Sequence, residues 1–190
     1  YTGGEVIAIP HNSNLSGGMM FSDKSIDGKP INRNYAQLSA RWEPIMEVTQ
    51  VKGDSETHPR LSPDDEFADF ETFETNLGLK VAEDAMLKHE YARGALKEGL
   101  RHQENLKVNP YKFGMIGSTD SHNSLVTPEE DNFFGKFVES EPSPDRTKTK
   151  LAGGRLWENW RISASGYAAV WAIENTRDAL FAAIKRKEVY

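Results

Sequence analysis

The order of apolar and polar positions along the chain predicts strands that alternate with helices. Residues 5–10 (EVIAIP) are almost wholly apolar and end at a proline, which is typical of a strand buried on both faces. Residues 45–51 (IMEVTQV) predict a second strand, residues 113–117 (FGMIG) a third, and residues 168–173 a fourth. These runs are too short for core helices and are bounded by polar or turn-forming residues.

The longest predicted helix covers residues 83–107. Ala85, Ala92, Leu96 and Leu100 recur on one face at helical spacing. A further helical turn is expected after Pro63.

A second helix is predicted near the C-terminal end. Asn175 is expected to cap its start, and Leu180, Phe181 and Ile184 form its apolar stripe. Strands alternating with helices at these spacings predict an α/β fold with parallel strands. In such folds ligands bind at the carboxyl ends of the strands.

Residues 123–166 show no clear periodicity. A stretch of this length is too long for a plain connection in a compact domain, so it predicts a lid or an insertion. Because it directly follows the third predicted strand, we expect it to cover the strand ends. It carries five large aromatic side chains that could pack it: Phe133, Phe134, Phe137, Trp157 and Trp160.

Composition narrows the classes of function. The chain has 190 residues, which suits one domain with a real core, and a net charge of -6, which argues against a nucleic-acid surface. The longest apolar run, residues 167–173, is far too short to span a membrane. The absence of cysteine excludes disulfides and thiolate metal sites. Neither a nucleotide-binding glycine loop nor a serine-hydrolase elbow occurs, and the compartment is left open.

The two ends of the sequence predict a fragment of a longer protein. The chain opens at Tyr1 without an initiator Met and closes at Tyr190 directly after a basic helix end. The strand at residues 5–10 would then lack its upstream neighbour. Because unpaired strand edges are adhesive, we expect a homodimer through this edge.

Candidate metal ligands follow two of the predicted strands. Asp120 and His122 come just after the third strand, and in an extended segment such i and i+2 side chains point the same way, with Cα atoms about 6.5 Å apart. His11 follows the first strand in the same way. Carboxylate and imidazole together suit Zn, Mn or Fe, so the three residues predict a divalent metal site. The alternative is that Asp120 caps a turn and His122 is an ordinary loop residue.

Other polar residues have two interpretations each. His58, in the loop after the second strand, is either a ligand or proton-transfer group, or a solvated loop residue. Glu47, within the second strand, either points to a metal or pairs with Lys or Arg. Lys52 either contacts an anionic substrate or lies on the surface. His89 and His102 are expected on the surface of the long helix.

Several segments taken together resemble a known superfamily. They are IPHNSN, EVTQVKGDSETHP, LSPDDEFADFE, NPYKFGMIGSTDSHNS, EEDNFFGK and the final stretch AAVWAIENTRDALFAAIKRKEVY. Their order resembles the PHP (polymerase and histidinol phosphatase) superfamily, and most closely its PHP-like subfamily catalogued as a domain of unknown function. The resemblance implies a distorted β/α barrel, TIM-like, with divalent metals at the carboxyl ends of its mostly parallel strands.

The resemblance also implies roles for individual residues. It implies metal binding by His11, Asp120 and His122, proton transfer by His122 or His58, substrate contacts by Lys52, Glu56 and Asn12, and a supporting role for Glu47. The His-x-His motif and the Asp-His pair that open a PHP domain do not occur in this chain. Residues 1–190 therefore resemble only the C-terminal portion of one such domain, a partial barrel whose site would be completed by residues upstream.

The function expected on this basis is metal-dependent hydrolysis of a small anionic substrate, a phosphoester by default. The attacking water would be activated by the metals. The alternative is a noncatalytic binding module that recognises a sugar or a protein partner through residues 123–166.

Overall fold

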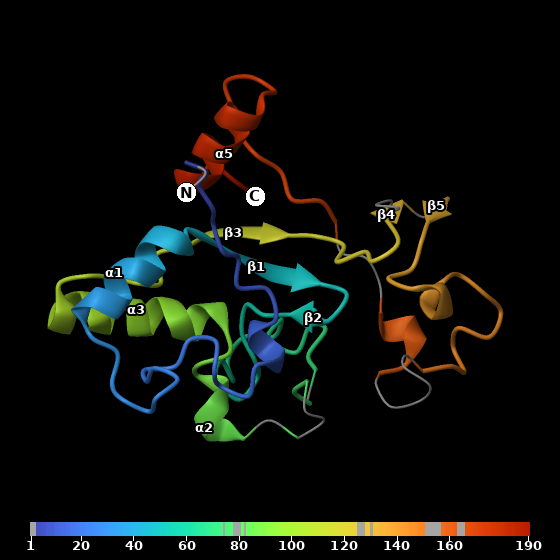
Figure 1. The fold of residues 1–190 in the computed structure, drawn as a ribbon. Coiled ribbons are helices and arrows are strands. Elements are labelled where there is room, and N and C mark those ends of the chain that lie inside the picture. The colour runs from blue at the N-terminus through green and yellow to red at the C-terminus, as the bar shows by residue number, and fades with distance from the viewer. Residues whose placement is uncertain are drawn as a thin grey trace.

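The fold is built on a small open sheet, whose strands lie one above another in the centre of Figure 1. The computed structural model describes residues 3–73, 75–77, 81, 83–124, 128–129, 131–150, 157–162 and 166–190. The sheet contains β1 (Ile45–Gln50), β2 (Gly53–Asp54) and β3 (Gly114–Gly117) in the order β2-β1-β3. β1 is parallel to β3 and antiparallel to β2.

The expected β/α barrel is therefore wrong. Within the described residues the sheet is three-stranded, mixed and open, and two of the four predicted strands are not part of it. Residues 5–10 are not paired as a strand, and they attach through backbone hydrogen bonds of Ala8 N to Trp42 O (2.6 Å) and of Glu47 N to Pro10 O (2.9 Å) and through the Lys185–Glu5 ion pair (2.8 Å). An apolar run predicts burial, but it becomes a strand only where a neighbouring edge continues beside it.

The other missing strand pairs with the end of the chain instead of the sheet. Val170 forms an isolated antiparallel bridge with Val189. The predicted homodimer stays a prediction, although the barrel edge on which it was to form does not exist here.

The helices also differ from the predicted ones. They are α1 (Arg33–Trp42), α2 (Asp84–Leu87), α3 (Ala92–Leu106) and α5 (Arg177–Lys185). The sequence pattern did not reveal α1, which begins after Asn32, whose side chain accepts a hydrogen bond from Tyr35 N. The predicted helix at 83–107 is interrupted between α2 and α3. The cap of α5 is Thr176 rather than Asn175, because the Thr176 hydroxyl accepts from Ala179 N.

The remaining elements are short. β4 (Pro128–Glu129) and β5 (Asn132–Phe133) form a two-stranded ribbon, and 3₁₀ helices occupy Ser13–Leu15, Val138–Ser140 and Asn159–Arg161. No helix in the described part of the chain has the length and apolar character that crossing a bilayer requires.

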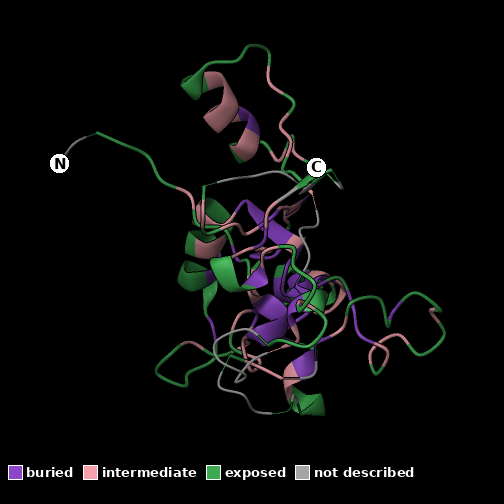
Figure 2. Ribbon diagram, turned by 90° about the vertical axis from the view of Figure 1, so that its right-hand side faces the viewer, coloured by how far each residue is buried: buried purple, intermediate pink, exposed green. Residues whose placement is uncertain are grey.

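The main core lies between α3 and the sheet, where buried positions concentrate in Figure 2. Its buried members are Phe21, Met46, Ala92, Ala95 and Tyr111. α5 and the chain ends lie on the opposite side of the sheet (Figure 1). The core therefore anchors β1 and fixes the direction in which its carboxyl end points.

The two histidines predicted on the helix surface are buried. His102 packs edge-on against the Tyr111 ring with 5.9 Å between ring centroids, and burial lowers its pKa. His89 places Nδ1 3.0 Å from Phe21 O. The surface prediction was wrong because the apolar face of α3 continues through His102 toward the aromatic core.

Candidate functional site

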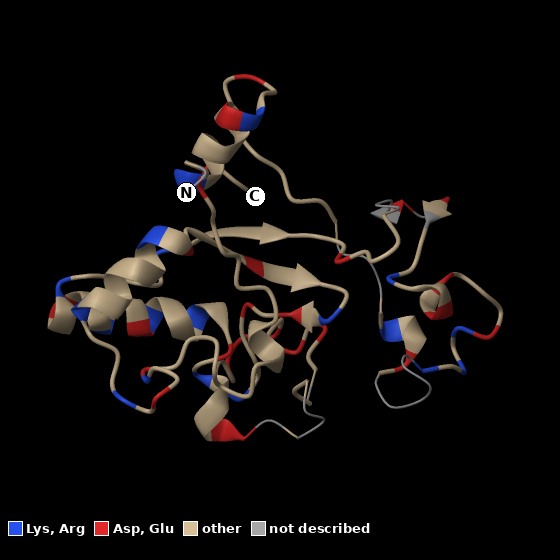
Figure 3. Ribbon diagram, viewed as in Figure 1, with Lys and Arg blue, Asp and Glu red and all other residues tan. Residues whose placement is uncertain are grey.

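The candidate site lies where β1 and β3 end together. The two strands run parallel, with Thr49 opposite Gly117, so the loops that follow them leave from the same edge. The described residues of 123–166 lie mostly beyond the arrowheads of β1 and β3 in Figure 1. Figure 3 shows acidic positions on β1 and just after β3, with basic positions in the loop after β1 and in the segment after β5.

Glu47 is held by neutral donors at this edge. Its side chain is 5% exposed, accepts from Gln50 Nε2 at 2.9 Å, and accepts from the Ser118 hydroxyl. In a regular strand Glu47 and Gln50 would face opposite sides, but the β1–β3 register shifts between Glu47 and Thr49. The bulge thus allows both side chains to meet, and it ties the carboxylate to the loop after β3.

Lys52 is the buried cation of the site. It is 3% exposed, so the interpretation as a surface lysine is wrong. Its ammonium donates to the Ser55 hydroxyl, which donates to Asn14 Oδ1 at 3.1 Å. Burial lowers the Lys52 pKa to about 8, and the negative charges of Glu47, Asp54 and Asp120 oppose this shift.

Asp120 and His122 lie close together, although the segment is not extended at Asp120 as the prediction assumed. His122 Nε2 lies 3.6 Å from Asp120 Oδ1, and the other carboxylate oxygen forms an ion pair with Lys136. The His122 ring stacks on Phe137 at 4.8 Å between centroids. Asp120 has a φ of 49°, a left-handed conformation that Asp tolerates better than most residues.

The pair of donor atoms has the separation that a shared cation needs. Zinc–nitrogen and zinc–oxygen bonds of roughly 2.0–2.2 Å at tetrahedral angles place two ligand atoms about 3.3–3.6 Å apart. The 3.6 Å between Asp120 and His122 is close to this value. Among the described residues, however, no group of three or more His, Asp or Glu side chains could hold a metal ion. Two ligands of the predicted metal site thus fit, and a third is not assembled with them.

His11 is exposed, although residues on both sides of it in the sequence contact β1 and the turn that follows it. The preceding Pro10 accepts from Glu47 N, and Asn14 donates to Lys52 O. The His11 ring places Nδ1 3.1 Å from Ile9 O. Its membership of a metal site therefore stays a prediction.

The other predicted site residues have different surroundings. His58 is buried rather than solvated, accepts from Arg60 N at 3.1 Å, and packs 5.6 Å from the Tyr91 ring. Glu56 pairs with Arg93 at 2.6 Å. Asn12 precedes the first 3₁₀ helix, and its side chain makes no cap bond there.

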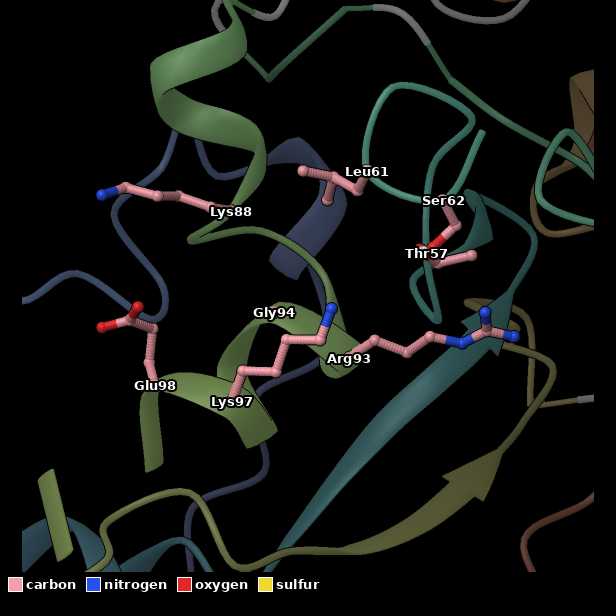
Figure 4. A pocket seen from close by; sticks show the side chains of 8 residues that line it. All are labelled: Thr57, Leu61, Ser62, Lys88, Arg93, Gly94, Lys97 and Glu98. Carbon is pink, nitrogen blue, oxygen red and sulfur yellow. Dashed lines mark hydrogen bonds between the residues drawn. The ribbon is translucent and has the colours of Figure 1, made fainter. Parts of the chain in front are cut away.

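A separate pocket of about 170 Å³ lies at the start of α3 (Figure 4). It is lined by Thr57, Leu61, Ser62, Lys88, Arg93, Gly94, Lys97 and Glu98. Figure 4 shows the Arg93 side chain extending away from Lys88, and its guanidinium is bound by Glu56 and Asp65. Glu56 thus forms an ion pair beside this pocket, and its substrate contact stays a prediction.

Sequence reasoning missed five residues of the site: Asn14, Gln50, Ser55, Ser118 and Lys136. Ser118 lies two residues before Asp120, so its position was a usable signal. Asn14 and Ser55 are 41 positions apart, and no local pattern connects them. Lys136 lies in the FFGK segment, which carries no spacing that points to Asp120.

Comparison with known proteins gives one result. A family model described as "Protein of unknown function (DUF3604)" matches residues 1–190. No PHP match is found, so the expected membership of the PHP superfamily is not supported. The short segments that carried the resemblance lack the opening ligand motifs of that superfamily. Searches of the curated proteins and of the solved structures return no match.

Proposed function

The chain belongs to the family described as "Protein of unknown function (DUF3604)", and we propose from its site that it is a divalent-metal-dependent hydrolase of anionic esters. The observation that carries the proposal is the 3.6 Å approach of Asp120 and His122 next to a buried lysine. Carboxylate, imidazole and ammonium groups at one strand edge suit an anionic substrate bound near a cation.

Each residue has a distinct role in this proposal. Asp120 and His122 hold the cation, which when bound would activate a water and polarise the ester. Lys52 supplies a buried positive charge next to Asp120. The carboxylate of Glu47 helps to keep this lysine protonated. The hydrogen bonds from Gln50 and Ser118 hold Glu47 in this position. Phosphomonoesters are the first substrates to test.

Removing the Asp120 carboxylate should weaken metal binding at least about tenfold, because one of two ligands loses its charge. The variant is Asp120→Asn, since Asn also tolerates the left-handed backbone of this position. Manganese binding is measured by titration calorimetry, and hydrolysis of p-nitrophenyl phosphate is measured in parallel.

The matched control is Asp145→Asn, which removes an exposed acid from residues 123–166. This variant should bind manganese as the wild type does. Equal manganese affinity of the wild type and Asp120→Asn would contradict the proposal.

A noncatalytic binding module is the second candidate. It is favoured by one observation, namely that the described residues contain no group of three metal ligands. The same experiment separates the two functions, since a binding module would show no manganese-dependent ester hydrolysis.

A further inference from the structure

Lys136 and His122 approach different carboxylate oxygens of Asp120. Its ammonium pairs with Asp120 Oδ2, whereas His122 approaches Oδ1. Both partners of the ion pair are largely buried, with 15% of the Lys136 side chain and 20% of the Asp120 side chain exposed. The carboxylate proposed as a metal ligand is thus already neutralised by a cation from the protein.

We propose that Lys136 is a built-in competitor of the divalent cation at Asp120. This inference rests on the proposed function and concerns the regulation of the same site. When no cation is bound, Lys136 keeps the buried carboxylate paired. When a cation binds Asp120, the ammonium leaves, and metal affinity is lower than the two ligands alone would give.

The backbone around Lys136 is fixed independently of its side chain. His122 N donates to Lys136 O at 3.0 Å, and Asn123 Nδ2 donates to Gly135 O at 2.9 Å. Glu141 accepts from Asn123 Nδ2 at 3.1 Å and from Gly135 N at 3.2 Å. Residues 120–123 and 134–141 are therefore held together by bonds that the ammonium does not make. The Lys136 side chain can swing out while these bonds stay in place.

Electrostatics make the two occupancies exclusive. A buried carboxylate left without a partner is strongly destabilising, which explains why a lysine pairs with Asp120. An ammonium and a divalent cation on one carboxylate repel each other, and the largely buried position of Asp120 and Lys136 strengthens this repulsion. Lys52 adds further positive charge, since it interacts with Asp120 from the opposite loop.

The sign of a mutational effect separates competition from a purely structural role. If Lys136 competes with the cation, Lys136→Met should bind manganese at least about tenfold more tightly than the wild type. If Lys136 only holds Asp120 in place, the same variant should bind manganese more weakly. Lys136→Arg keeps the charge and should bind no more tightly than the wild type. Lys148→Met removes an exposed lysine of the same segment and should leave the affinity unchanged.

A second measurement uses the unmodified protein, so it does not depend on how the variants fold. Acetic anhydride modifies accessible amines, and the modified lysines are counted by mass spectrometry. Adding manganese should raise the modification rate of Lys136 several-fold relative to that of Lys148. An unchanged ratio, or equal or weaker manganese binding by a folded Lys136→Met, would overturn the inference.

The Asp120→Asn variant keeps this result distinct from failure of the proposed function. If Asp120→Asn loses affinity and Lys136→Met gains none, only the competition is wrong. If Asp120→Asn binds manganese as the wild type does, the metal site itself is wrong.

Discussion

Raising the pH from about 8 to about 10 should stabilise the folded chain by about 2 kcal/mol through Lys52 alone. Burial lowers the pKa of Lys52 to about 8 in the folded chain, from an ordinary value of 10.5. Between these values the folded chain has released the proton and the unfolded chain still holds it. A rise in pH therefore favours the folded state, at about 1.4 kcal/mol for each unit of pKa difference. Below pH 8 both states are charged, and the full penalty of burying the ammonium applies.

The measurement is urea unfolding of the wild type and Lys52→Met at pH 7.5, 8.5 and 9.5. The free energy of unfolding should rise with pH in the wild type relative to Lys52→Met. Subtraction removes the groups that the two chains share, including Tyr111, whose buried hydroxyl has a raised pKa and acts in the opposite direction above pH 10. Lys29→Met, at an exposed position, should keep the wild-type slope. Equal slopes for the wild type and Lys52→Met would show that Lys52 keeps its ordinary pKa.

This stability penalty has a functional side. A buried lysine surrounded by Glu47, Asp54 and Asp120 stabilises the fold less than an apolar residue of similar size would. Strained or destabilising groups are common where binding or catalysis requires them. Lys52 is therefore better explained by the proposed site than by the fold.

The central strands could be predicted from the sequence, and the outer ones could not. β1 and β3 coincide with the predicted runs to within one residue because each has a partner and packs on the core. Residues 5–10 are equally apolar, yet Val6 is 65% exposed. Apolar character alone does not supply the neighbouring strand that a sheet requires.

The helices show the same limit. The pattern at 83–107 is helical throughout, but tertiary contacts interrupt it. The buried Glu90 accepts from Gly18 N at 3.1 Å, and Gly94 lies so close to Lys88 O that a Cβ would be 2.5 Å away. The Glu90 side chain is hydrogen-bonded to a distant loop, and the helix is interrupted there. Local periodicity does not reveal such a long-range contact.

In the site, local relations were predictable and distant ones were not. Asp120 and His122 are two residues apart just after β3 and lie 3.6 Å from each other, although Asp120 has a left-handed rather than an extended backbone. Lys136 reaches Asp120 from 16 positions further along the chain, through a segment with no periodic pattern. The surroundings of Lys52 depend on Asn14, which precedes α1 in the sequence and is brought close to Lys52 only by the fold. A sequence can thus nominate the ligand pair, whereas its counter-ions emerge only from the folded chain.

Replacing Gly53 by Ala should lower the free energy of unfolding by about 3 kcal/mol, because two separate penalties add. Gly53 has a φ of 85°, a conformation that costs roughly 1–2 kcal/mol for a residue with a Cβ. An added Cβ would also lie 2.1 Å from Glu71 O and 2.4 Å from the Phe73 ring. Overpacking of this kind costs about 1–3 kcal/mol. Neither neighbour can easily move, since Glu71 O accepts from Asp54 N and Phe73 packs 4.8 Å from Trp157.

Gly28→Ala is the matched control for this prediction. Gly28 has a similar φ of 78°, but nothing lies within 4 Å of an added Cβ. Its replacement should therefore cost about 1 kcal/mol, from the backbone alone. The difference between the two variants in urea unfolding measures how tightly the turn after β1 is packed against residues 71–73. Because Lys52 directly precedes Gly53, that packing also holds the buried lysine at the site. Equal losses for the two variants would mean that the turn yields to the added methyl group, and that Lys52 is not rigidly placed.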